Sequence, residues 1–282
     1  MLQHSGNSAN TEGPITVPRV RVAITRGVSP AIGRCELTHL NRTPIDIDVA
    51  KAQHALYEAA LGELGCRVQR LDEEPDLPDS VFVEDVAVVL DEVAIITRPG
   101  VSARRGERPS VERALEPHRP LAHIREPGIL DGGDVLVVEK DIHIGISSRS
   151  DANALDQVQA IVADHGYRVD GIDVRGCLHL KSAVTAVSDD TLLINPAWVD
   201  PADLGGRTCI PVDPSEPGAA NVVRVGDTVL VGAAFPRTGE RLSAAGFEVR
   251  PVDASELAKA EGALTCCSLL FHVPDSNAGA LR

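Results

Sequence analysis

Aromatic side chains are scarce in this sequence of 282 residues, which contains one Trp, two Tyr and four Phe. Apolar residues still make up 43% of the chain, so the interior must be packed mainly from Val, Leu, Ile and Ala. That mixture is typical of strands backed by helices. No apolar run is as long as the roughly 20 residues that a membrane-spanning helix needs, so we expect a soluble protein.

Positive charge is also in deficit, because 27 Lys and Arg stand against 41 Asp and Glu, a formal net charge of −14. The average field of such a protein repels nucleic acid and acidic membrane surfaces, and it attracts small cations. We therefore expect no nucleic-acid partner and no membrane partner. A small cationic ligand is compatible with the negative net charge.

The N-terminal segment 1–18 lacks the apolar stretch and the positively charged start of a secretion signal. It is interpreted as a loosely ordered leader on a cytoplasmic protein. The six cysteines should then be free thiols, because that compartment reduces disulfides. The sequence has no Cys-x-x-Cys or His-x-x-x-His spacing, so we expect neither a structural zinc site nor another cofactor.

The rest of the chain repeats one pattern, in which two short apolar runs flank a turn and are followed by a helical or Pro-rich segment and a further strand. The four hairpins lie at 82–100, 131–149, 179–196 and 220–234. Their spacing of roughly 40 to 50 residues is in the range of repeat architectures. The pattern therefore predicts a repeat fold.

The two ends of the chain supply a fifth unit. The strand "RVRVAI", a helix over 46–65 and a strand over 66–71 lack one strand of a hairpin, and the apolar run 264–271 could complete it. Closing the ring in this way removes exposed sheet edges. We predict a single α/β domain over 19–282, a five-bladed α/β propeller of repeated ββαβ units around a central channel.

Polar residues that are unusual in strands occur at or near the first strand of the hairpins. Equivalent positions in a closed radial repeat converge near one axis. These residues are Asp79, Glu84, Asp85, Asp131, Asp134, His179 and Cys266. Acids, an imidazole and a thiol are therefore expected to share one small space.

Two adjacent cysteines stand in the apolar run "LTCCSLLF". On a strand, neighbouring side chains point to opposite faces. Cys267 shares its face with Leu269 and Phe271 and is interpreted as a core residue, the usual fate of a free cysteine, whereas Cys266 is expected to face the channel. The alternative is that both cysteines only fill space, but the predicted convergence of His179 and the acids favours a reactive Cys266.

Five motifs, "DSVFVEDVAVV", "ITRPG", "LDGGDVL", "HLKS" and "LTCCS", occur in this order along the chain. In order and spacing the chain resembles the dimethylarginine dimethylaminohydrolases from about residue 19 to residue 272. These are guanidine-modifying enzymes with a five-bladed α/β propeller. The resemblance implies hydrolysis of asymmetric dimethylarginine or monomethylarginine to citrulline and dimethylamine or methylamine, through a covalent thiouronium on a cysteine.

By this resemblance, the catalytic residues are Cys266, His179 and Asp131. Cys266 would be the nucleophile, His179 would exchange protons with the amine and the water, and Asp131 would orient the histidine. A near-neutral reference pKa suits an imidazole for both proton transfers. Carboxylates close to a thiol disfavour its thiolate, so we expect activation by the bound guanidinium or by His179.

The resemblance also implies two groups that recognise the substrate. Asp85, and with less support Glu84, would bind the guanidinium as paired acceptors. Arg98 and Arg149 would hold the α-carboxylate, a task suited to the fixed donor fork of arginine. Neighbouring arginines 104, 105 and 108 are interpreted as solvated surface residues.

Other substrate contacts carry over from the family residue by residue. Asp79 would contact polar groups of the substrate, and Phe82 its aliphatic stem. Leu37 and Ala260 would contribute backbone carbonyls. Glu261 stands where the family often has aspartate, so its role near the thiol is open.

Three alternatives remain at this point. The chain could be a sister enzyme with the same nucleophile, an arginine deiminase or an amidinotransferase, although the inserted helical module and the "TRD" segment of deiminases are absent. It could bind methylated arginine without turnover. Cys266 and His179 could also hold zinc, as an inhibitory site and not as a cofactor. The chain could also form a homodimer.

Overall fold

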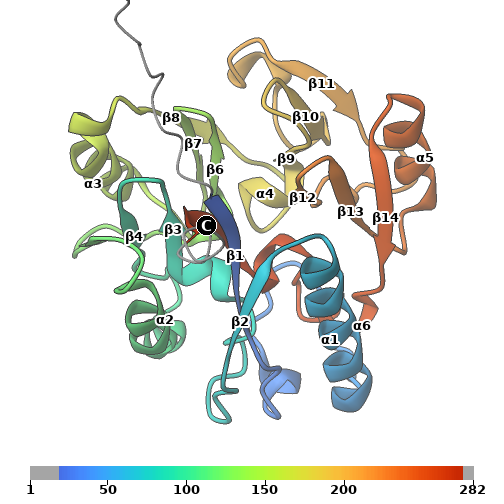
Figure 1. The fold of residues 1–282 in the computed structure, drawn as a ribbon, viewed down its shortest axis with the longest axis horizontal. Helices are drawn as coiled ribbons and strands as arrows, with labels where there is room; N and C mark the ends of the chain where they lie inside the picture. The colour runs from blue at the N-terminus through green and yellow to red at the C-terminus, as the bar shows by residue number, and fades with distance from the viewer. Residues whose placement is uncertain (1–18, 276–282) are drawn as a thin grey trace, which may run out of the picture.

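Five three-stranded sheets surround a central axis in the computed structural model, which describes residues 19–275 (Figure 1). The predicted leader 1–18 lies outside the described residues, and the division into a leader and one domain over 19–282 stays a prediction. Over the described range, no helix is both long and apolar enough to cross a membrane.

Every sheet has the same topology. A short first strand runs antiparallel to the middle strand, and the middle strand runs parallel to the third. Four sheets are continuous in sequence: β3 (Ala87–Val89), β4 (Ala94–Ile96) and β5 (Leu121–His123); β6 (Val135–Val138), β7 (Asp141–Ile146) and β8 (Arg168–Asp173); β9 (Val184–Ala186), β10 (Thr191–Ile194) and β11 (Thr208–Pro211); β12 (Val223–Val225), β13 (Thr228–Gly232) and β14 (Glu248–Val252). The predicted hairpins are confirmed.

The fifth sheet joins the two ends of the chain. Its order is β15-β1-β2, with β1 at Arg19–Arg26, β2 at Arg67–Leu71 and β15 at Leu269–Pro274. Strands β1 and β15 pair antiparallel, from Arg19 opposite Pro274 to Ile24 opposite Leu269. The predicted closure of the ring is therefore confirmed, and the C-terminal strand takes the place of the missing first strand.

Helices connect the middle and third strands on the outside of the ring (Figure 1). They are α1 (Ile47–Glu63), α2 (Arg108–Leu115), α3 (Ala152–Val162) and α5 (Pro236–Ala244), while the β10–β11 connection has only a 3-10 turn at Pro201–Asp203. The side chain of Asp46 caps α1 by accepting hydrogen bonds from the N–H groups of Asp48 and Val49. The helix ends before Gly65, whose φ of 86° turns the chain toward β2.

The core is aliphatic, as the composition predicts. Fully buried side chains on the middle strands include Ile24, Ile95, Ile144, Leu193 and Leu230. The five first strands line a central cavity of about 290 Å³. The predicted propeller of ββαβ units is confirmed, with helices outside and a cavity along the axis.

The predicted first strands begin too early in four places that matter for the site, because one helical turn precedes each of β3, β6, β9 and β15. Segments Val83–Val86 and Thr265–Cys267 are single 3-10 turns, and β3 and β15 start only at Ala87 and Leu269. Strand alternation therefore does not apply to the pair Cys266–Cys267. Their side chains still point in different directions, because successive residues of a 3-10 turn are about 120° apart.

Candidate active site

One-turn helical segments carry the polar residues of the repeats. They precede four of the five first strands, at Val83–Val86, Gly132–Asp134, α4 (Leu180–Ala183) and Thr265–Cys267, and a further short helix, α6 (Ser255–Ala258), lies before the last of them. Because these turns stand at equivalent places in the repeats, they meet near the axis at one end of the ring. Side chains far apart in sequence are brought together there.

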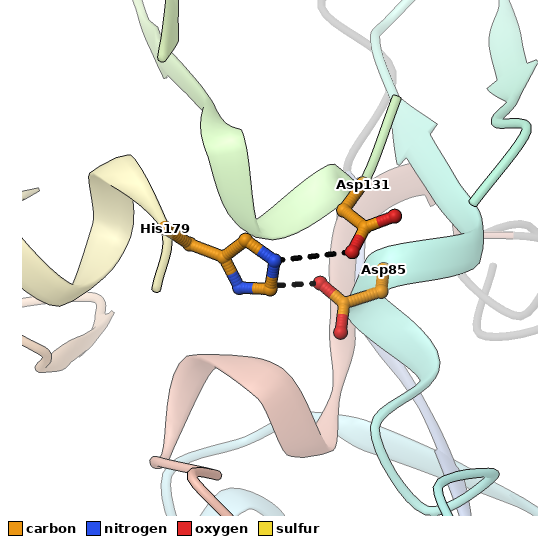
Figure 2. Close-up of side chains that lie close together, drawn as sticks. All are labelled: Asp85, Asp131 and His179. Carbon is orange, nitrogen blue, oxygen red and sulfur yellow. Dashed lines mark hydrogen bonds and ion pairs between the residues drawn. The ribbon is translucent and has the colours of Figure 1, made fainter. Parts of the chain in front are cut away.

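His179 lies between two carboxylates in this group (Figure 2). Its Nε2 is 3.1 Å from Oδ2 of Asp131, and its Nδ1 is 3.8 Å from Oδ1 of Asp85. All three side chains are almost completely buried. The predicted convergence of acids and imidazole is therefore present in the structure.

Two glycines allow these turns to approach so closely. A Cβ atom on Gly133 would lie 2.4 Å from Nδ1 of His179, and one on Gly132 would lie 2.0 Å from the carbonyl oxygen of Glu84. Neither position could carry a side chain without moving its neighbours. The N–H of Gly133 also donates a hydrogen bond of 3.0 Å to Oδ1 of Asp85. The "DGGD" motif thus provides close contact as well as acids.

The charges at this site shift the pKa values of its members. Burial alone would lower the pKa of His179, but the charge of Asp85 and the hydrogen bond to Asp131 outweigh burial and raise that pKa to about 9. Burial opposes ionisation of Asp85, yet the charges of His179 and Arg104 lower its pKa to about 2. At neutral pH the pair is an imidazolium beside a carboxylate.

Cys266 has the opposite tendency. Burial, with the charges of Glu84 and Asp85, raises the pKa of its thiol to about 12, so the thiol is protonated at neutral pH in the protein without ligand. Burial also raises the pKa of Cys267 well above its usual range, and Cys267 donates a hydrogen bond to the carbonyl of Ala263 within the apolar core.

Most of the residues predicted for the site line one cavity together with Cys266. Those are Asp79, Phe82, Asp85, Arg149, His179, Ala260 and Glu261, joined by Glu36, Arg104, Leu178 and Gly262. The cavity volume is about 20 Å³, room for about one water molecule. The arrangement is therefore closed around its reactive groups.

The segment 36–40 is held over this cavity by three of the predicted substrate residues. Both carboxylate oxygens of Asp79 accept from the N–H of Glu36 at 3.2 Å, and Arg149 donates to Oγ1 of Thr38 at 2.9 Å. Glu261 accepts from the N–H groups of Thr38, His39 and Leu40 at 2.5 to 3.0 Å. Its carboxylate is thereby directed at this segment.

Four predicted residues are not among those that line the cavity. Asp131 is fully buried, with its Oδ2 3.1 Å from Nε2 of His179. Arg98 donates to the carbonyl of Gly128 at 3.2 Å and lies 3.4 Å from a carboxylate oxygen of Glu126. Leu37 is half-buried and packs against the apolar cluster that contains Phe82 and Cys266. Glu84 is buried and lines the central cavity along the axis instead.

The charged residue that the sequence interpretation placed wrongly is Arg104. It is 4% exposed, and it donates to Oδ2 of Asp85 at 2.6 Å and to both oxygens of Glu107 at 3.0 and 2.9 Å. The expectation of a solvated surface arginine is therefore wrong. Two buried carboxylates need a cation close by, and the Arg104 guanidinium supplies it. Its hydrogen bond also orients the Asp85 side chain.

Three further residues near the site were not predicted from the sequence. Lys181 forms an ion pair with Glu84, Thr265 donates to the other oxygen of Glu84 at 2.7 Å, and Asn221 bonds to Thr265. Lys181 stands inside the "HLKS" motif and Thr265 inside "LTCCS". Asn221 opens the fourth hairpin, a position equivalent to the other site residues, and could have been found from the repeat.

A metal ion would find three ligand atoms here. Oxygens of Asp85 and Asp131 and a nitrogen of His179 lie within 4.8 Å of one another. The imidazole would first have to release the proton that its raised pKa retains. Cys266 does not belong to this group of ligand atoms, so the zinc pair of Cys266 and His179 stays a prediction.

Comparisons with known proteins agree with this geometry. A family model described as N,N dimethylarginine dimethylhydrolase, eukaryotic, matches residues 40–201. The chain is 40% identical over 248 residues to an N(G),N(G)-dimethylarginine dimethylaminohydrolase of Streptomyces coelicolor, covering 88% of this chain and 95% of that protein. It is 34% identical over 228 residues to the protein of the same name from Pseudomonas aeruginosa, covering 79% of this chain and 90% of that protein.

A solved structure gives the same result. A Cys-to-Ser mutant of the Pseudomonas aeruginosa dimethylarginine dimethylaminohydrolase, complexed with citrulline, superposes with a TM-score of 0.85 at 31% identity. The match covers 89% of this chain and 99% of that structure.

Proposed function

The chain belongs to the dimethylarginine dimethylaminohydrolase family, and from that premise we propose that it hydrolyses N-omega-methylated arginines to citrulline and dimethylamine or methylamine. The protein is a hydrolase of carbon–nitrogen bonds. The observation that supports this most directly is the buried group of Asp85, His179 and Asp131, which shares a small acidic site with Cys266. A guanidinium is the kind of cation that such a site would bind.

Substrate binding accounts for the activation of the thiol. Without ligand, burial and the neighbouring carboxylates hold Cys266 protonated, since its pKa is about 12. A guanidinium cation against Asp85 would offset those negative charges and favour the thiolate directly beside the carbon that it attacks. The nucleophile would then form mainly when a cationic substrate is present.

The remaining steps follow from His179. The sulfur of Cys266 bonds to the guanidinium carbon, and the carbon–nitrogen bond to the methylated nitrogen breaks as that nitrogen takes a proton from the imidazolium. The amine leaves, and a thiouronium remains on Cys266. The neutral imidazole then removes a proton from the attacking water, the carbon–sulfur bond breaks, and citrulline is released.

Recognition of the amino acid end is part of the proposal. Arg149 supports a site for the α-carboxylate because it lines the cavity that contains Cys266. Asp79 is suited to the α-amino group, and the backbone carbonyls of Leu37 and Ala260 would also contact the substrate. Because the cavity holds about one water, the segment 36–40 must move before a methylarginine can enter.

The experiment measures citrulline and amine from asymmetric dimethylarginine, together with the intact mass of the protein during turnover. We expect equal amounts of citrulline and dimethylamine and a mass increase on Cys266. Cys266→Ser should abolish both, while the matched variant Cys267→Ser should keep turnover and lose stability, since Cys267 packs in the core. Ammonia from unmethylated arginine would instead indicate a deiminase, and guanidinoacetate from added glycine an amidinotransferase.

A cytoplasmic location and a homodimer belong to the proposal as well. All six cysteines are free thiols, which suits a reducing compartment. Cell fractionation and the mass of the protein in solution would test these two points. Finding the protein outside the cell, or as a monomer, would show the corresponding point to be wrong without affecting the proposed reaction.

A further inference from the structure

The fourth repeat contributes a neutral residue at the place where the others contribute acids, histidine or cysteine. Asn221 stands just before β12 and is 5% exposed. Its Oδ1 accepts from the backbone N–H of Thr265 at 3.0 Å, and its Nδ2 donates to Oγ1 of Thr265 at 2.9 Å and to the carbonyl of Lys181 at 3.0 Å. Three contacts of a buried amide therefore end on two other repeats.

These bonds close a ring across four repeats. Oγ1 of Thr265 donates to Oε2 of Glu84 at 2.7 Å, and the ammonium of Lys181 pairs with Oε1 of the same carboxylate. Lys181 returns to Asn221 through its carbonyl. Four repeats are thus tied together at the axis by one lysine, one glutamate, one threonine and one asparagine.

The direction of each hydrogen bond in the ring is fixed by chemistry. A backbone N–H can only donate, so Oδ1 of Asn221 must face Thr265 N and its amide protons must serve the other two acceptors. The hydroxyl of Thr265 then has its own proton free for Glu84, which can only accept when ionised. Neither rotation of the Asn221 amide nor replacement by a carboxylate would keep this pattern.

Thr265 immediately precedes Cys266 in the turn Thr265–Cys267. The first N–H groups of a helical turn have no partner within the turn, and Asn221 supplies that partner from another repeat. The bonds to its N–H and its hydroxyl hold the backbone and the side chain of Thr265 at the start of the turn that carries Cys266. Asn221 itself does not line the cavity that contains Cys266.

From this geometry we infer that Asn221 is a positioning residue for the nucleophile. It acts through Thr265, fixing where the sulfur of Cys266 lies relative to the bound guanidinium. This inference rests on the proposed function, because it takes Cys266 as the nucleophile. Misplacement of a reacting group by about 1 Å can cost on the order of 100-fold in rate.

The test compares Asn221→Ala with Asn195→Ala. Asn195 is also 5% exposed, donates to the carbonyl of Pro217 at 2.9 Å and accepts from the N–H of Ala197 at 3.0 Å. It is therefore matched in type and burial, and both ends of its amide are also bonded. We expect kcat for dimethylarginine to fall about 100-fold in the first variant with KM nearly unchanged. The second variant should lose comparable thermal stability and keep kcat.

A double-mutant cycle tests whether the effect passes through Thr265. Thr265→Ser keeps both bonding groups and should retain activity, whereas Thr265→Val loses the hydroxyl and should lower kcat. Because both residues act as one unit, Asn221→Ala combined with Thr265→Val should be no slower than the slower single variant. Thr265→Val and the cycle keep the inference testable even where Asn221→Ala folds poorly.

Two results would overturn the inference: an unchanged kcat in Asn221→Ala, or rate losses that multiply in the double variant. A wild-type protein that forms no citrulline would contradict the proposed function instead. In that case the labelling of Cys266 by a neutral haloacetamide, followed by mass spectrometry, decides the point. Labelling several-fold faster in Asn221→Ala than in Asn195→Ala would support positioning, and equal labelling would refute it.

Discussion

Replacing Arg104 by methionine tests the buried ion pairs that this residue forms in the wall of the cavity with Cys266. The guanidinium donates to Asp85 at 2.6 Å, to Glu107 at 3.0 and 2.9 Å, and to the carbonyls of Asp79 and Phe82 at 3.3 Å. The side chains of Arg104, Asp85 and Glu107 are 5%, 3% and 2% exposed. Methionine fills similar space but leaves Glu107 buried without its cation, and it leaves Asp85 with only the His179 imidazolium, 3.8 Å away.

The expected loss is large for a single substitution. Removing one partner of a buried ion pair costs about 3–5 kcal/mol, and a domain has a free energy of unfolding of about 5–15 kcal/mol. At about 2–4 °C for each kcal/mol in a chain of this size, the melting temperature should fall by about 6–20 °C. Denaturant unfolding at pH 7.5, with the slope compared between variants, measures the loss directly.

The loss should depend on pH through Glu107. Burial raises the pKa of this carboxyl to about 7 even with Arg104 present, so without Arg104 its pKa must rise further. A raised pKa in the folded state gives stability that is present at acid pH and is lost as the pH rises through that pKa. The difference between wild type and Arg104→Met should therefore be smallest near pH 5 and grow above pH 7.

Arg105→Met is the matched control, because Arg105 is half-buried and donates one hydrogen bond, to the carbonyl of Pro99 at 3.1 Å. It should lose less than about 1 kcal/mol. The double variant Arg104→Met with Glu107→Met should recover part of the stability, since the carboxylate of Glu107 is removed and Asp85 keeps the His179 imidazolium beside it. If Arg104→Met were within 1 kcal/mol of the control, the assignment of a buried cation at this position would be refuted.

Two further predictions concern the substrate and the imidazole. Arg149→Ala should raise KM for dimethylarginine more than Arg98→Ala does, because Arg149 lines the cavity and Arg98 faces Gly128 and Glu126. Arg149→Ala should also raise KM for dimethylarginine more than KM for an analogue without the carboxylate. Steady-state kinetics with both compounds measures this, and equal effects on the two compounds would contradict the assignment. The raised pKa of His179, about 9 against an ordinary 6.5, should stabilise the folded state by about 3 kcal/mol below pH 6.5 and lose that contribution as the pH rises to 9. Unfolding of wild type and His179→Gln over this range checks it, and a difference between them that does not depend on pH would count against the ion pairs.

Closure of the ring could be predicted from sequence because it depends on short-range patterns and on counting. Each hairpin shows alternating apolar residues around a turn, and the N-terminal unit visibly lacks one strand. The run 264–271 was the remaining apolar segment, and β15 does fill that place beside β1. Sheet edges need partners, so an incomplete unit at each end of a chain is strong evidence that the ends meet.

The local conformation of the site residues could not be predicted in the same way. Val83–Val86 and Thr265–Cys267 contain β-branched residues typical of strands, yet they form 3-10 turns. Their stability comes from contacts with other repeats, such as the bond between Asn221 and the N–H of Thr265. Tertiary contacts of that kind leave no trace in the periodicity of the segment itself.

The partner of a charged residue is similarly hidden. Arg104 follows two residues typical of an exposed loop, and only the fold brings Asp85, 19 positions earlier, within 2.6 Å of it. The net charge of −14 argued for a cationic ligand, but part of the acidity at the site is already neutralised from within by Arg104, Lys181 and Arg149. The composition gives the number of charged residues but does not show which of them form ion pairs.

The pairing of charges explains why the site can keep a cysteine unreactive and still use it. Asp85 remains ionised because His179 and Arg104 hold its pKa at about 2. Burial raises the pKa of the Cys266 thiol, and the charges of Glu84 and Asp85 raise it further. The same carboxylate that opposes the thiolate is therefore the one suited to a guanidinium. A cation placed between them removes the opposition and supplies the electrophile at once, so activation and substrate selection depend on the same charge.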